Sequence, residues 1–123
     1  MEMGGRVSQL KTPQELYLDL IRMSAYNEFD GNQVVDWLEK HSDQWSAALM
    51  VQNPPGITLR DLPKNYNNVG TLLITTRDRD DALEIVRHAK KTWRADAARV
   101  VPGPEASEMM GGSEEFLVEL WWD

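Results

Sequence analysis

Val69-Gly70-Thr71-Leu72-Leu73-Ile74-Thr75-Thr76 decides the fold of this chain, because it predicts the first strand of a strand–helix–strand unit around which the rest is organised. The run is rich in β-branched residues and apolar in its middle, and it stops at a charged turn over residues 77–81. Apolar residues then recur at helical spacing as far as Trp93, and a second strand begins at residue 97. This order predicts one right-handed βαβ unit whose helix packs on a sheet completed by the rest of the chain.

Two helices are expected before this unit. The first follows a flexible arm at residues 1–11 and begins with a capping box formed by Thr12 and Glu15, with Pro13 at its first position. The second begins with Asp30 and Gln33, which have the same spacing. The short link between the helices predicts an antiparallel helical hairpin. The first helix carries an apolar stripe formed by Leu16, Tyr17, Leu20, Ile21, Met23 and Ala25.

The remaining strands are expected on either side of the central unit. Residues 42–52 are compatible with helix or strand, and we interpret their second half as a strand because two prolines follow at 54 and 55. Residues 53–68 then predict a long, irregular, lid-like connection. Pro102 and Gly111 frame a short helix, and residues 115–122 alternate as a last strand, parallel or antiparallel to its neighbours.

The fold class predicted from these segments is α+β with α/β-like features. Residues 12–123 form a single domain with the element order α-α-β-β-α-β-short α-β. The helical hairpin packs on a mixed sheet of about four strands that contains the βαβ unit.

Composition narrows the classes of function. The chain has 123 residues, no cysteine and a net charge of −7. The missing cysteines exclude a disulfide scaffold, a thiolate zinc site and a cysteine nucleophile. The negative charge disfavours nucleic acid as a partner, and no apolar run is long enough to cross a membrane. We therefore expect a soluble, cytoplasmic protein.

The sequence predicts no catalytic, cofactor or metal site. Only two histidines occur, His41 and His88, and neither belongs to a metal-ligand or catalytic motif. The helix start at residues 75–79 could attract an anion through its threonines and arginines, but the acidic residues that follow oppose one. The basic residues between Arg87 and Arg94 predict a solvated helix face.

Aromatic residues are the most unusual feature, because five tryptophans occur in this short chain. Trp37 lies off the apolar stripe of its helix, and the adjacent Trp121 and Trp122 point to opposite faces of the last strand. With Tyr66 in the long connection, these residues are candidate partner contacts. The leading hypothesis is a non-enzymatic binding or regulatory module that contacts a protein partner or a second copy of itself. By analogy with inhibitor or immunity-type proteins, its acidity suits a basic partner.

A second hypothesis is a small-molecule binder or enzyme. Its pocket would lie between the helical hairpin and the sheet, under residues 53–68. The residues expected to line it are Tyr26, Asn27, Tyr66, Thr76 and Arg77.

Overall fold

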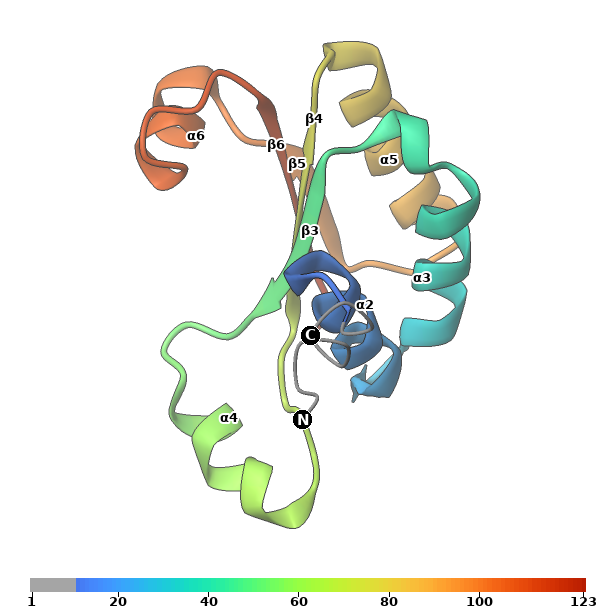
Figure 1. The fold of residues 1–123 in the computed structure, drawn as a ribbon, viewed down its shortest axis with the longest axis vertical. Helices are drawn as coiled ribbons and strands as arrows, with labels where there is room; N and C mark the ends of the chain where they lie inside the picture. Colours follow the sequence, from blue (N-terminus) through green and yellow to red (C-terminus); the bar gives the residue numbers. More distant parts are fainter. Residues whose placement is uncertain (1–10) are drawn as a thin grey trace, which may run out of the picture.

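A four-stranded antiparallel sheet forms the centre of the computed structural model, which describes residues 11–123 (Figure 1). Its strands lie in the order β3 (Ala47–Val51), β4 (Thr71–Thr76), β6 (Phe116–Trp121) and β5 (Ala97–Val100). The α+β class and the predicted order of the main elements are confirmed. The predicted arm at residues 1–11 lies, except for Lys11, outside the described residues.

The last strand occupies an interior position that the sequence did not specify. Because β6 pairs antiparallel with both β4 and β5, those two strands run parallel to each other without being neighbours. The sheet was expected to be mixed, but all of its neighbouring strands pair antiparallel. The physical reason lies in β6 itself, where Leu117 and Val118 are both buried, as suits a strand covered on both faces. Strand β5 exposes Ala97 and Arg99 and stays at the edge.

The N-terminal hairpin consists of α2 (Pro13–Met23) and α3 (Gly31–Lys40), linked through the two-residue strands β1 (Ala25–Tyr26) and β2 (Phe29–Asp30). Both predicted caps are present, since Thr12 and Glu15 bond reciprocally and Asp30 accepts a hydrogen bond from the backbone of Gln33. A Cβ atom at Gly31 would lie 2.0 Å from the carbonyl oxygen of Ile21. Glycine at this position therefore allows the two helices to approach closely.

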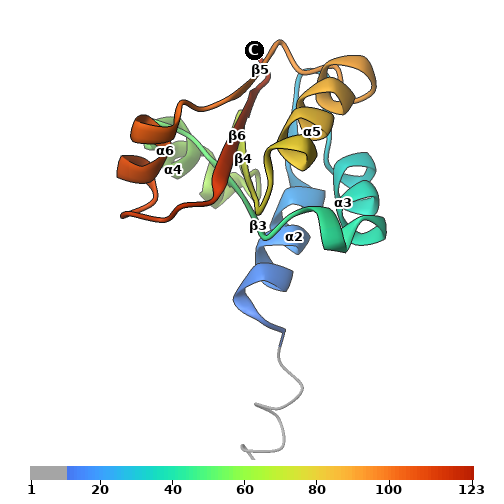
Figure 2. The same cartoon turned by 90° about the horizontal axis from the view of Figure 1, so that it is seen from above.

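Helices cover the two faces of the sheet unequally. Helices α2, α3 and α5 (Arg79–Lys91) lie on one side, and α4 (Gly56–Asp61) and α6 (Gly103–Met109) lie on the other (Figure 2). The first side contains the main core, which includes Ile21, Val34, Val35, Leu38, Leu72, Ile74, Ile85, Trp93, Val118, Leu120 and Trp122. A smaller cluster lies under α6 and contains Val101, Ala106 and Leu117.

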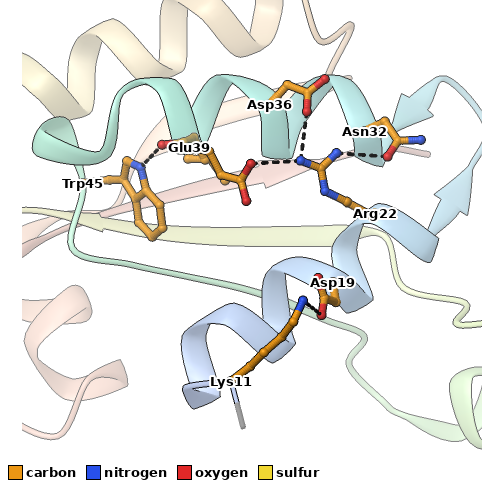
Figure 3. A network of polar contacts seen from close by, with 8 residues as sticks. Lys11, Asp19, Arg22, Asn32, Asp36, Glu39 and Trp45 are labelled. Atoms are coloured by element: carbon orange, nitrogen blue, oxygen red, sulfur yellow. Dashed lines mark hydrogen bonds and ion pairs between the residues drawn. The ribbon is translucent and has the colours of Figure 1, made fainter. Parts of the chain in front are cut away.

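Helix α2 is rotated so that much of its apolar stripe faces outward. Leu18 and Ile21 are buried, whereas Leu16, Leu20 and Met23 are exposed. The guanidinium of Arg22 binds three side chains of α3, as Figure 3 shows: Asn32 at 3.1 Å, Asp36 at 2.9 Å and Glu39 at 3.1 Å. Because these contacts hold the polar side of α2 against α3, the stripe on its other side cannot turn into the core.

The segments before β4 contain more helix than the sequence predicted. Residues 42–52 form the 3₁₀ turn η1 (Ser42–Gln44) and then β3, so their second half is a strand as interpreted. The connection at residues 53–68, expected to be irregular, contains α4 and the 3₁₀ turn η2 (Leu62–Lys64). Asp61, the last residue of α4, links this helix to the end of the connection. Its buried carboxylate accepts hydrogen bonds of 2.9 Å from Arg60 and from Asn68. These bonds hold the pKa of Asp61 well below its ordinary value.

Within residues 11–123, no helix is long and apolar enough to cross a membrane.

Candidate functional site

The two adjacent tryptophans of the last strand have opposite environments. Trp122 is fully buried, where its Nε1 donates a hydrogen bond of 2.9 Å to the carbonyl oxygen of Trp93 and its ring meets Phe29 edge to face. Trp121 points to the other side and leaves 44% of its surface exposed. The predicted division between two faces is therefore present. Trp122 belongs to the core and leaves the set of candidate contact residues.

Trp121 lies on what we call the outer sheet face, the side of the sheet turned away from α2, α3 and α5. Strand alternation and pairing place Leu49 beside Leu73, and Val51 beside Thr71 and then Trp121. Leu49, Val51 and Leu73 are only partly buried. An apolar sheet face that remains open to solvent is uncommon in a protein that makes no contacts there. The residues of this face are Ala47, Leu49, Val51, Thr71, Leu73, Thr75, Ala97, Arg99, Leu117, Glu119 and Trp121.

A shallow groove lies where α6 meets this face. Its volume is about 180 Å³, and it is lined by Met109 at the end of α6, the following Met110, and Leu49 and Leu73 of the sheet. Met109 leaves 48% of its surface exposed. Methionine side chains adapt to differently shaped apolar partners, which is a property of many binding surfaces. The groove lining is Ala47, Ala48, Leu49, Leu73, Thr75, Met109, Met110 and Leu117.

Acidic side chains dominate the segment that forms this side of the molecule. Residues 97–123 contain one basic and six acidic residues, a net charge of −5. The single cation, Arg99, bonds Glu119 at 2.8 Å and Glu105 at 2.9 Å, and these bonds raise its pKa. Because Arg99 is already paired, the segment presents an excess of carboxylates beside the apolar face.

The third tryptophan among the candidates, Trp37, is engaged inside the chain. Its half-buried ring stacks on His41 at a centroid distance of 4.1 Å and on His88 at 5.1 Å, and it meets Trp93 edge on at 5.6 Å. Burial lowers the pKa of His88, and the nearby His41 lowers it further. This aromatic cluster joins α3 to α5, so the predicted partial exposure of Trp37 coexists with a packing role.

The described residues of the alternative pocket lie in different environments. Thr76 is fully buried, and its hydroxyl donates a hydrogen bond of 2.7 Å to the carbonyl oxygen of Asp78. Asn27 and Arg77 are exposed, and the side chain of Tyr26 lies outside what the structure describes. Tyr66 instead lines a cavity of about 280 Å³ between α2 and η2, on the edge of the segment expected to form a lid. The contact between hairpin and sheet is filled by core residues such as Leu38 and Leu72.

The start of α5, where the sequence offered only weak grounds for an anion site, is capped by the chain itself. Asp78 caps the helix by accepting a hydrogen bond of 2.9 Å from the backbone of Asp81. Asp80 and Asp81 add negative charge in the first turn. Within residues 11–123, no three His, Cys, Asp or Glu side chains lie together as metal ligands would.

Sequence reasoning missed one apolar surface, which we call the α2 patch and define as Pro13, Leu16, Tyr17, Leu20, Met23 and Leu62. Four of these residues, Leu16, Tyr17, Leu20 and Met23, were assigned from their spacing to the apolar stripe of the first helix. The signal that could have separated them from Leu18 and Ile21 is the apolar character of both sides of this helix.

The fold and these surfaces define a small α+β domain with one open sheet face and one exposed helix face. Known protein families, curated proteins and solved structures were compared with this chain, and none matched.

Proposed function

We propose that the protein is a non-enzymatic binding module that holds a basic protein partner against its outer sheet face. The observation that carries this proposal is Trp121, a large aromatic residue left 44% exposed on the same sheet face as the partly buried Leu49, Val51 and Leu73. Tryptophan is among the residue types most enriched in binding hot spots. The groove beside α6 gives an apolar partner residue a place to enter.

The basic character of the proposed partner follows from the carboxylates around this face. With a net charge of −5 in residues 97–123, the surface attracts Lys and Arg side chains and repels acidic ones. Such attraction accelerates encounter and weakens with added salt, because exposed charges are screened beyond about 10 Å at 0.1 M ionic strength.

An affinity experiment with matched variants tests the proposal. Immobilised wild-type protein, Trp121→Ala and Met23→Ala would be exposed to a lysate of the source cells, and the retained proteins identified and purified. We expect a basic protein that binds wild type and Met23→Ala, elutes with salt and loses at least tenfold in affinity for Trp121→Ala. Titration calorimetry with the purified partner measures that loss. Equal binding by all three proteins would refute the assignment of the outer sheet face.

A second function, small-molecule binding, is supported by the cavity beside Tyr66. Asn65 and Asn67 supply polar groups at its wall, and Leu20, Met23 and Leu62 supply apolar ones. Its volume of about 280 Å³ is close to the ~300 Å³ at which small-molecule sites begin. Native mass spectrometry of protein purified from its own cells would reveal a bound compound, and a Tyr66→Ala variant should release it.

A further inference from the structure

The α2 patch is the largest group of exposed apolar side chains among the described residues. Met23 leaves 73% of its surface exposed, Leu16 56% and Leu62 47%. Leu20 at 39% lies between them on the helix. Together these side chains expose several hundred Å² of apolar surface, a size at which patches commonly mark interfaces.

The patch contains hollows as well as projections. Pro13, Leu16, Tyr17 and Leu20 line a hollow of about 390 Å³. The cavity of about 280 Å³ beside Tyr66 begins on the other side of Leu20 and includes Met23 and Leu62. A surface that alternates projecting and hollow positions along one helix can fit a surface of the same shape.

The elements that carry the patch hold nearly balanced charge. Residues 11–23 contain two basic and two acidic residues, and Lys11 bonds Asp19 at 2.7 Å (Figure 3). Residues 56–64 contain two basic residues and one acidic residue, and Asp61 bonds Arg60 at 2.9 Å and lies 3.8 Å from Lys64. A strongly charged partner would therefore find little free opposite charge here. A second copy of the chain meets the same balanced border, whereas contact between two acidic outer sheet faces would be repulsive.

We infer that the α2 patch is the contact between two copies of this chain in a two-fold symmetric dimer. In an isologous contact each patch faces itself, so the two α2 helices pack antiparallel. The axis passes near Leu20, and Met23 of one copy enters the hollow beside Leu16 and Tyr17 of the other. The inference goes beyond the proposed function, because it assigns a different surface to a different partner.

The size of the patch sets the strength of the dimer. Helix α2 has 11 residues and so spans roughly 16 Å. This length offers less contact than the ~800 Å² per partner of a standard stable interface. The dimer therefore dissociates on dilution, with monomer at micromolar and dimer at millimolar protein.

Sedimentation analysis over that concentration range tests the inference. Wild type should shift from monomer to dimer, and Met23→Glu or Leu16→Glu should remain monomeric because each buries a carboxylate at the contact. The matched control is Met109→Glu, which places the same charge at an exposed methionine of α6 and should leave the dimer unchanged. Circular dichroism establishes that each variant folds. A wild-type protein that stays monomeric at millimolar concentration, or a dimer that survives both α2 substitutions, would overturn the inference.

Cross-linking locates the axis. Because the chain has no cysteine, Leu20→Cys introduces a single thiol. An added oxidant should link it to its copy as a disulfide. The control Met109→Cys should stay largely unlinked, and equal linkage of both variants would count against the assigned axis. Failure here is distinguishable from failure of the proposed function, because Trp121→Ala should weaken partner binding at least tenfold and leave the dimer intact.

Discussion

The indole Nε1 of Trp122 donates a hydrogen bond to the carbonyl oxygen of Trp93, which joins the end of β6 to the residues that follow α5. Both rings are buried, so neither group can bond to water instead. We predict that Trp122→Phe lowers the free energy of unfolding by about 2–4 kcal/mol, from a lost buried bond and an imperfectly filled space. Urea denaturation measures the change. Trp121→Phe is the control, with an expected change of about 0.5 kcal/mol or less because Trp121 leaves 44% of its surface exposed to solvent.

Gln14 protects the edge of the sheet with a single side chain. Its amide donates a hydrogen bond of 2.8 Å to the carbonyl oxygen of Ala48 and accepts one of 2.9 Å from the N–H of the same residue. Gln14→Ala should cost about 1–3 kcal/mol of stability and expose an edge that can pair with other chains. Denaturation and light scattering on warming measure the two effects. Gln33→Ala, at an exposed glutamine of α3, should change neither.

Gly31 is required by the close approach of the two N-terminal helices. A methyl group at this position would overlap the carbonyl oxygen of Ile21, which is backbone and cannot rotate away. Gly31→Ala should therefore destabilise the protein by about 3 kcal/mol or more. Gly56→Ala is the matched control, because a Cβ there meets nothing within 4 Å. A thermal shift of the same size in both variants would contradict this explanation.

Asp61 should make stability depend on acid. Its folded pKa lies below the ordinary 3.8, so its contribution is complete above that value and is lost as pH falls through the folded pKa. Wild type should therefore be more stable than Asp61→Asn at neutral pH, and the difference should shrink once pH falls below the ordinary value. Thermal unfolding of both proteins from neutral to strongly acidic pH measures this. A difference that is constant with pH would exclude the carboxylate as its source.

His88 should titrate below the ordinary value of 6.5, because burial disfavours its charged form and His41 lies nearby. The stability linked to this depressed pKa is present above 6.5 and falls as pH drops below it. In His41→Asn the pKa of His88 should rise only partly, since burial is the larger cause. Proton NMR of the imidazole measures both values, and a full return to 6.5 in the variant would show that burial contributes little.

How far the sequence predicts this fold depends on how many faces of each element are apolar. The caps at Thr12 and Asp30 involve residues three positions apart in the chain, so the spacing in the sequence was sufficient to predict them. Helix α2 is apolar on two sides, and the choice between them depends on Arg22 reaching α3 and on Gly31 meeting Ile21. Both are contacts between elements that no periodicity within α2 contains.

Prediction of the candidate site from the sequence meets the same limit. Alternation separated Trp121 from Trp122 but could not say which one was covered, because that depends on where the helices lie. Helix α4 within residues 53–68 was not predicted, and the hydrogen bond between Asp61 and Asn68 joins two parts of this segment that no local periodicity relates.

The position of β6 has a consequence for synthesis of the protein. Strands β4 and β5 have no partner between them until residues 116–121 have left the ribosome. A nascent or truncated chain that stops earlier presents two unpaired strand edges at the centre of its sheet. The sheet is therefore completed only after residues 116–121 have been synthesised, and interruption of synthesis before this segment should yield a species prone to aggregation.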